Sequence, residues 1–401
     1  MLTQGKDDDK EKWQNSRREA CYTLSIEGTI TFCLSNNRKD IRDCILTINS
    51  NNEGDVFMNR PYVNLSSENI IDNFMAALDK EIEKLKLIDG IAGITLNGGL
   101  SRGYADHLSE IDIVIYLEKR HFENRQNAKT PLPLGIVKLA GYLYDIKIVD
   151  IESEENRIWD SVSLWDLSYS KILFDPEGKI ERLMNDKLCR TPKVSEAEAL
   201  LFSAWWYYRL AGDIWLHRGD SLQGHYILNK AIVPLIEAMF IVNGEYIPHE
   251  KWIVHMSRSL EWKPEHWEKR LAKVMGTGDL SIQNLIDRQA AIEGIWKEID
   301  EHLVRKEYPG FKLCSSQRHY YSLLKFLVDK GTVTVKEWEA MSGINALNYE
   351  PFYSIVRIDN GLIILDNDRL LSLRPEDMYY WMYDIVQYVR NEKSDKELQN
   401  S

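Results

Sequence analysis

Residues 94–117 read ITLNGGLSRGYADHLSEIDIVIYL, and this stretch decides the fold of the chain. An apolar run breaks at a pair of glycines, turns at a third glycine, and continues into a run in which apolar and acidic side chains alternate. Short apolar and alternating runs predict strands, and clustered glycines predict a turn between them. We therefore expect two strands of one sheet joined through a tight glycine turn.

Two acids, Glu110 and Asp112, lie two positions apart on the second predicted strand. Because successive side chains on a strand point to opposite faces, both carboxylates leave the same face of the sheet. Like charges held side by side repel each other, and a divalent cation between them would offset that repulsion. Carboxylate oxygens suit Mg²⁺, so the spacing predicts a site for one or two Mg²⁺ ions.

The turn before these acids offers groups that bind phosphate. Gly98, Gly99 and Gly103 allow the backbone to turn sharply and to approach a ligand closely, and Ser101 lies within the same turn. Exposed backbone amides and the Arg102 guanidinium can donate hydrogen bonds to phosphate oxygens. A phosphate cradle beside a metal-binding pair of acids is what phosphoryl and nucleotidyl transfer require.

The string GGLSRG at 98–103, followed by SEIDI at 109–113, resembles the signature of the DNA polymerase beta-like nucleotidyltransferase superfamily. The resemblance implies an α+β fold whose core is a mixed sheet with flanking helices. It also implies that Glu110 and Asp112 hold the catalytic Mg²⁺, and that residues of the glycine turn bind the triphosphate of ATP or another nucleoside triphosphate. These residues are Gly98, Gly99, Ser101, Arg102 and Gly103.

The superfamily also places a third carboxylate on a later strand, and Asp145 in the alternating run 144–149 matches that position. Asp145 thus becomes a metal ligand and the candidate general base. Gly99 stands where serine is common in the superfamily, and Glu110 stands where aspartate is common. A plain surface hairpin is the alternative, since glycine pairs and acid-x-acid strands each occur on exposed sheets, but the order of the three features favours the site.

Composition bounds the class of protein. A length of 401 residues allows two or three domains. The formal net charge of -12 argues against a protein that coats nucleic acid, because phosphate binding needs clustered Lys and Arg. The five cysteines are widely spaced without a CxxC pair, which is typical of reduced thiols. The first residues are charged and no uncharged apolar window approaches membrane-spanning length, so we expect a cytoplasmic protein without a membrane partner.

Changes of pattern along the chain predict four regions. Residues 1–60 form a β-rich N-terminal extension of unknown role, and residues 61–190 form the catalytic domain. Residues 191–312 carry long helical patterns and resemble the bundle that walls the acceptor side of the cleft in bacterial antibiotic nucleotidyltransferases. Residues 313–401 read as two helices followed by a hairpin, which predicts a small winged-helix-like domain.

The predicted bundle contributes four candidate site residues. His225 and Asn229 are four positions apart and share a helix face, so they could line the acceptor side; equally, they could be core polar residues satisfied by neighbouring helices. His249 lies in a polar loop and is a third acceptor-side candidate. Lys251 in the same loop could reach the triphosphate, although a solvated loop lysine is the alternative.

The winged-helix-like region does not have the charge of a DNA reader. From residue 315 onward, ten Lys or Arg residues are outnumbered by thirteen Asp or Glu residues. Winged helices often bind DNA, but a net negative charge leaves no electrostatic footprint for a duplex. We expect this region to pack against the rest of the chain or to bind a protein partner.

These features lead to three hypotheses. The first is an enzyme that moves AMP from ATP to a hydroxyl of a small acceptor, such as an aminoglycoside-like antibiotic, and releases pyrophosphate. The second keeps this chemistry but takes a protein or RNA acceptor, which the extra N-terminal and C-terminal regions would serve. The third is a nucleotide-sensing protein that binds without turnover.

Overall fold

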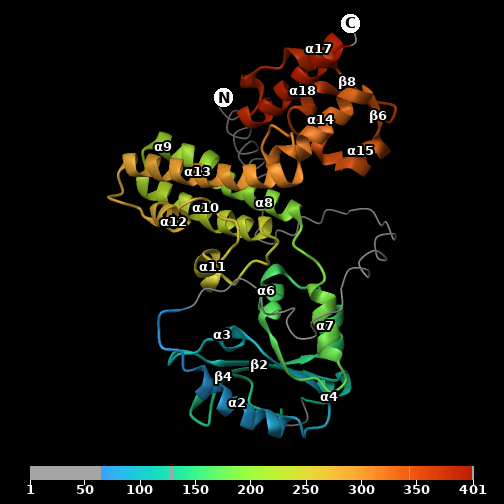
Figure 1. The fold of residues 1–401 in the computed structure, drawn as a ribbon. Coiled ribbons are helices and arrows are strands. Elements are labelled where there is room, and N and C mark those ends of the chain that lie inside the picture. Colours follow the sequence, from blue (N-terminus) through green and yellow to red (C-terminus); the bar gives the residue numbers. More distant parts are fainter. Residues whose placement is uncertain (1–64, 126–129, 343, 400–401) are drawn as a thin grey trace, which may run out of the picture. The chain divides into compact units, whose positions relative to one another are not determined.

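The computed structural model describes residues 65–125, 130–342 and 344–399, and all of them fall within one unit of the chain, residues 57–401 (Figure 1). The predicted N-terminal extension, residues 1–60, lies outside the described residues. The first described helix is α2, Ile71–Leu85, whose apolar residues recur every three or four positions. This spacing places them on one helix face, and that face is buried. Its members are Phe74, Leu78, Ile82 and Leu85.

A five-stranded mixed sheet forms the core of the first half. Its order is β3-β4-β2-β1-β5; β2 and β4 are parallel, whereas the other neighbours are antiparallel. The strands are β1 Ile91–Leu96, β2 Ile111–Leu117, β3 Gly135–Leu139, β4 Tyr142–Asp150 and β5 Lys171–Phe174. With the helices described below, this arrangement confirms the predicted α+β fold class.

The two faces of the sheet have different partners. One face packs on α2 through a buried cluster that includes Ile113 and Ile146. The opposite face packs at one end on α7, Lys179–Leu188, through Tyr116 and its neighbours. Figure 1 shows the sheet between α2 on one side and α6 and α7 on the other. The remaining helices of this half are α3 Gly98–Ser101, α4 Lys119–Asn124, α5 Ile151–Asn156 and α6 Ser161–Tyr169.

Long helices follow the sheet. They share a buried core rich in aromatic and branched side chains, as expected for bundle helices. A π-helical turn, Trp206–Ala211, joins two of them, and the side-chain amide of Gln289 donates a hydrogen bond of 2.7 Å to the Tyr208 carbonyl within it. The helices are α8 Val194–Trp205, α9 Gly212–Arg218, α10 Ser221–Val242, α11 Glu250–Ser257, α12 Trp267–Met275 and α13 Ile282–Glu307.

Among the described residues, α10 is the one helix long and apolar enough to cross a membrane by length and composition. The helix contains Lys230 and Glu237, so it does not contradict the expectation that no uncharged apolar window reaches this length. In addition, 67% of the apolar window of α10 is buried inside the protein, as in the core helix of a soluble domain. The apolar residues of α10 are thus explained by packing, and the cytoplasmic location stays a prediction.

The C-terminal region has the order helix, strand, helix, short helix and hairpin, with the last strand between the other two. This is the connectivity of a winged helix. Its buried residues continue the core of the bundle in a single cluster, so the boundary at residue 312 stays a prediction. The elements are α14 Arg318–Lys330, β6 Thr332–Thr334, α15 Val335–Ser342, α16 Phe352–Ile355, β7 Val356–Asp359, β8 Leu362–Leu365, α17 Asn367–Ser372 and α18 Tyr380–Gln399.

Candidate active site

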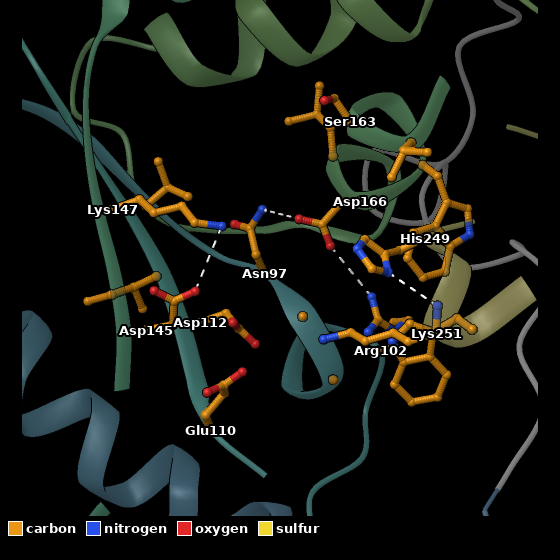
Figure 2. Close-up of a pocket in the computed structure, with 18 of the residues that line it drawn as sticks. Asn97, Arg102, Glu110, Asp112, Asp145, Lys147, Ser163, Asp166, His249 and Lys251 are labelled. Atoms are coloured by element: carbon orange, nitrogen blue, oxygen red, sulfur yellow. Dashed lines mark hydrogen bonds and ion pairs between the residues drawn. The ribbon is translucent and has the colours of Figure 1, made fainter. Parts of the chain in front are cut away.

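Three predicted carboxylates line one pocket of about 740 Å³ on the sheet face opposite α2. Asp112 on β2 is paired in register with Asp145 on the parallel strand β4. Glu110 precedes the first residue of β2 and lies two positions before Asp112. Figure 2 shows the three carboxylates on the same side of the pocket. The structure thus brings together the acids that the sequence pattern selected.

The glycine turn lies directly against Asp112. Gly98 has a φ of +66°, and a Cβ atom added there would lie 1.8 Å from Oδ2 of Asp112. The backbone amide of Asn97 also donates a hydrogen bond of 2.9 Å to the backbone carbonyl of Asp112, which fixes the turn to the start of β2. Only glycine satisfies both the backbone conformation and the close approach at position 98. Gly98 and Gly99 both line the pocket.

Two other predicted nucleotide-binding residues shape the turn rather than line the pocket. The Ser101 hydroxyl donates a hydrogen bond of 2.8 Å back to the Gly98 carbonyl. The Gly103 carbonyl accepts a hydrogen bond of 2.9 Å from the Asn69 side chain. The φ of Gly103 is +88°, a backbone conformation that only glycine adopts without strain. Neither residue is among those that line the cavity. Their contact with nucleotide stays a prediction, and the hydrogen bonds show that both residues help to hold the turn.

Asp112 lies in a strongly negative environment. Burial is the main cause that raises the pKa of Asp112 to about 6, and the charges of Glu110, Asp166 and Asp145 add to it. The positive charge of Lys251 lowers the pKa of Asp112 in part. A carboxyl group whose ionised form is disfavoured by three neighbouring acids is one that a bound cation would stabilise.

The donor set fits a hard divalent cation in its chemistry, since oxygens of three carboxylates face one pocket. As the side chains stand, no three His, Cys, Asp or Glu side chains of the described residues are grouped closely enough to hold an ion. Lys147 lies beside one of the acids, with its Nζ 3.8 Å from Oδ2 of Asp145 (Figure 2). This ammonium group supplies some of the positive charge that the acids lack.

Arg102 is far more enclosed than a surface phosphate contact would be. Its side chain is 2% exposed, and its guanidinium lies 3.6 Å from Oδ1 of Asp166. The guanidinium carbon is 4.8 Å from the ring centre of Trp165 and 4.9 Å from that of Trp252. Arg102 lines the pocket, so it keeps access to the site, but aromatic rings and a carboxylate surround it.

Helix α11 brings two predicted residues to the opposite wall. His249 is the N-cap of α11, and its Nδ1 accepts a hydrogen bond of 3.2 Å from the Lys251 amide. Both side chains line the pocket. Figure 2 shows Arg102, His249 and Lys251 across the pocket from the three carboxylates. The site therefore has an acidic wall made by strands and a basic wall made by the turn and α11.

His225 and Asn229 do not reach this pocket. Both lie on α10 and bind Arg288 of α13, a buried arginine that also donates to the carbonyls of His225 and Val274. His225 is only 2% exposed, and burial lowers its pKa. His225 is thus a buried polar residue bound to a neighbouring helix, whereas Asn229 is exposed and binds the same arginine. Neither residue lines the pocket, and their acceptor-side role stays a prediction.

The pocket continues beyond the carboxylates on the same sheet face. Val114 and Val149 follow the acids at alternate positions of β2 and β4 and line its floor. Trp159 lines the far end, where the Arg157 guanidinium lies 4.5 Å from the centre of its ring and pairs with Glu154 at 2.9 Å. This end combines an apolar floor, an aromatic ring and charged groups.

Sequence reasoning missed several residues of the site. Asp166 on α6 accepts a hydrogen bond of 2.9 Å from the Asn97 side chain and lines the pocket with a 40% exposed side chain. Asn97 and Lys147 carried a readable signal, because one precedes the glycine pair and the other lies two positions beyond Asp145 on the same strand face. Asp166 and Trp252 carried none, since their places depend on how α6 and α11 pack.

A match to a protein-family model supports the interpretation of this region. Residues 78–173 match the nucleotidyltransferase domain family. A comparison with curated proteins finds no match. Among solved structures, a nucleotidyltransferase-like protein from Exiguobacterium sibiricum 255-15 is similar at 10% sequence identity and a TM-score of 0.37, over 71% of this chain and 93% of that chain.

The matched segment contains the glycine turn, Glu110, Asp112 and Asp145. This part of the chain is therefore a nucleotidyltransferase domain of the polymerase beta-like superfamily, as its motif predicted. Such a domain transfers a nucleotidyl group and takes a nucleoside triphosphate as substrate.

Proposed function

We propose that the chain transfers AMP from ATP to a hydroxyl of a small acceptor and releases pyrophosphate. The observation that carries the proposal is the convergence of Glu110, Asp112 and Asp145 in one pocket, beside a glycine turn that touches Asp112. The basic wall across the pocket supports it, because a triphosphate needs positive charge on the side away from the metal-binding acids.

The proposed reaction is an in-line displacement. The acceptor oxygen forms a bond to the α-phosphorus, its proton passes to the Asp145 carboxylate, and the bond from the α-phosphorus to the bridging oxygen breaks. That oxygen leaves with the electron pair as part of pyrophosphate. Lys251 and Arg102 offset the charge that develops on the leaving group. The amides of the turn at Gly98 and Gly99 orient the phosphates.

Glu110, Asp112 and Asp145 are the residues that would hold Mg²⁺. When bound, Mg²⁺ draws negative charge from the phosphate oxygens and lowers the barrier to attack. In the protein alone, burial and then the charges of Glu110, Asp166 and Asp145 raise the pKa of Asp112. A cation bound there would offset the cost of ionising Asp112.

The far end of the pocket supports a small acceptor with cationic or hydroxyl groups. Glu154 and Trp159 line that end, and the partly exposed Asp166 lines the same cavity beside Asn97 and Arg102. Carboxylates bind ammonium and hydroxyl groups, while an aromatic ring packs on the apolar face of a sugar or ring system. An aminoglycoside-like antibiotic has these properties.

The test uses ATP labelled on the α-phosphate, Mg²⁺ and panels of aminoglycosides and other polyhydroxylated amines. We expect label to enter a small product with release of one pyrophosphate per transfer. Asp112→Ala removes the central ligand and should abolish the transfer, whereas Asp287→Ala, on the exposed surface of α13, is the matched control and should leave turnover unchanged.

The products separate the rival hypotheses. Label on a protein or RNA band after addition of cell extract would replace the small acceptor with a macromolecular one. Tight binding of ATP without pyrophosphate release, across every acceptor panel, would contradict transfer and support nucleotide sensing. Replacing ATP by GTP, CTP or UTP tests the choice of nucleobase.

A further inference from the structure

Three elements from separate parts of the chain meet around the Arg102 side chain. Arg102 follows the glycine turn, Trp165 lies on α6, and Trp252 lies on α11 of the helical bundle. The centres of the two tryptophan rings are within 4.9 Å of the guanidinium carbon, and Tyr169 adds a third ring at 5.8 Å. A planar guanidinium can pack an aromatic ring against its face, which a lysine ammonium cannot do in the same way.

The ring contacts are reinforced by polar ones. Asp166, next to Trp165, forms an ion pair of 3.6 Å with Arg102 and accepts a hydrogen bond of 2.9 Å from Asn97. Asn97 and Arg102 stand on either side of the GGLS sequence of the turn, so Asp166 ties both ends of the turn to α6. Trp252 then connects this assembly to α11.

Helix α11 carries the groups that complete the basic wall. Lys251 is the immediate neighbour of Trp252, and His249 is the N-cap of the same helix. The position of Lys251 against the glycine turn therefore depends on where α11 lies. The contact of Trp252 with Arg102 joins α11 to the turn that holds the proposed phosphates.

We propose that Trp252 and Trp165 are positioning residues that clamp Arg102 between them and so hold α11, with Lys251, against the glycine turn. The clamp makes the two basic groups of the pocket a single unit whose geometry is set before nucleotide arrives. The role in nucleotide binding rests on the proposed function; the mechanical role of the clamp does not.

The first experiment tests the clamp without nucleotide. Hydrogen exchange of the α11 amides is measured in the wild-type chain and in Arg102→Lys, Trp252→Ala and Trp252→Phe. Arg102→Lys keeps the charge but loses the planar face, so we expect exchange in α11 to rise about tenfold in this variant and in Trp252→Ala. Trp252→Phe keeps a ring and should stay within about twofold of wild type. Exchange in α12 should not change in any of them.

A matched control separates the clamp from general loss of packing. Trp262 stacks on His302 within the bundle, with 3.8 Å between the centres of the two rings, and is not among the residues that line the pocket. Trp262→Ala should not change exchange in α11. The hydrogen bond from the Ile247 amide to the Ser161 hydroxyl, at 2.7 Å, still holds the loop before α11 in Trp252→Ala. Should Trp252→Ala fail to fold, Trp252→Leu and Arg102→Lys carry the same test.

The second experiment measures ATP affinity in the presence of Mg²⁺ by calorimetry, together with KM and kcat. Trp252→Ala should weaken ATP binding and raise KM by about tenfold, with kcat within about threefold, because Trp252 acts through Arg102 and Lys251. Arg102→Lys should weaken ATP binding by a similar factor and should also lower kcat, since Arg102 offsets charge on the leaving group. The double variant should be no weaker than either single variant. Additive losses would instead show that Trp252 touches the nucleotide itself and would overturn the clamp.

The two experiments fail in different ways. Unchanged α11 exchange in Arg102→Lys and Trp252→Ala would refute the clamp whether or not ATP binds. Loosened α11 in the variants, with no ATP binding by the wild-type chain, would establish the clamp and refute the proposed function.

Discussion

Replacing Asp112 by asparagine should stabilise the metal-free protein while removing its activity. Burial and three neighbouring acids raise the pKa of Asp112 from 3.8 to about 6 in the folded chain. The folded state therefore binds the proton more tightly than the unfolded state. The free energy of unfolding then falls as pH rises from about 4 to about 6 and is constant above that range, since Asp112 is ionised in both states there.

The size of the effect follows from the difference in pKa. A change from 3.8 to about 6 corresponds to about 3 kcal/mol, and partial exposure of Asp112 to the pocket reduces the expected gain to about 1–3 kcal/mol. Asparagine has nearly the same shape and carries no charge, so it does not incur this cost. Asp112→Asn should thus unfold at a higher temperature than wild type at pH 8, and the difference should vanish near pH 4.

Thermal unfolding followed by circular dichroism, with EDTA present, checks this prediction at pH 4, 6 and 8. Asp106→Asn is the opposite control, because the Leu108 amide is the main group that lowers the pKa of Asp106. Its replacement should lower the unfolding temperature at pH 8. If Asp112→Asn were as stable as wild type or less stable at pH 8, or if its gain were equal at pH 4, the acids would not disfavour one another as the structure indicates.

Two further predictions concern the turn and the bundle. Gly98→Ala places a Cβ on the Asp112 carboxylate and should abolish transfer and lower the unfolding temperature, whereas Gly103→Ala, with φ of +88° but open space around it, should cost only backbone strain of about 1 kcal/mol. The fall in unfolding temperature caused by Gly98→Ala should be smaller when Asp112 is also replaced by alanine. An equal fall in that background would contradict the steric argument. Asn229→Ala removes a partner of buried Arg288 and should lower stability by about 1–3 kcal/mol without changing the acceptor KM; a raised KM at unchanged stability would restore Asn229 to the acceptor side.

The carboxylates could be predicted from sequence because their placement is local. The two-residue period of a strand puts Glu110 and Asp112 on one face. The alternation of apolar and polar residues around Asp145 likewise predicts a strand with Asp145 on its polar face. The pairing of Asp112 with Asp145 then needed only that the two strands be neighbours. The family resemblance supplied that neighbour relation.

The environment of Arg102 could not be predicted in the same way. Its enclosure depends on Trp165 and Trp252, which are 63 and 150 positions further along the chain and lie on helices with no motif of their own. The same limit applies to His225, whose spacing on α10 marks a helix face but does not say whether that face meets a pocket or Arg288. Contacts between helices far apart in sequence decide these cases.

The division of charge in the pocket shows why the helical bundle belongs to the site. The segment that matches the nucleotidyltransferase domain ends at residue 173, so it includes the three carboxylates, Arg102 and Asp166, but not α11. Lys251 and His249 therefore come from outside the matched domain. Among the described residues, the matched segment alone lines the pocket with six carboxylates, and its three pocket cations, Arg102, Lys147 and Arg157, are each paired with one of them. These ion pairs offset part of the positive charge that could oppose a triphosphate. On the proposed function, Lys251 supplies positive charge for the triphosphate from outside the matched domain, so we expect α11 and the bundle to form part of the catalytic unit.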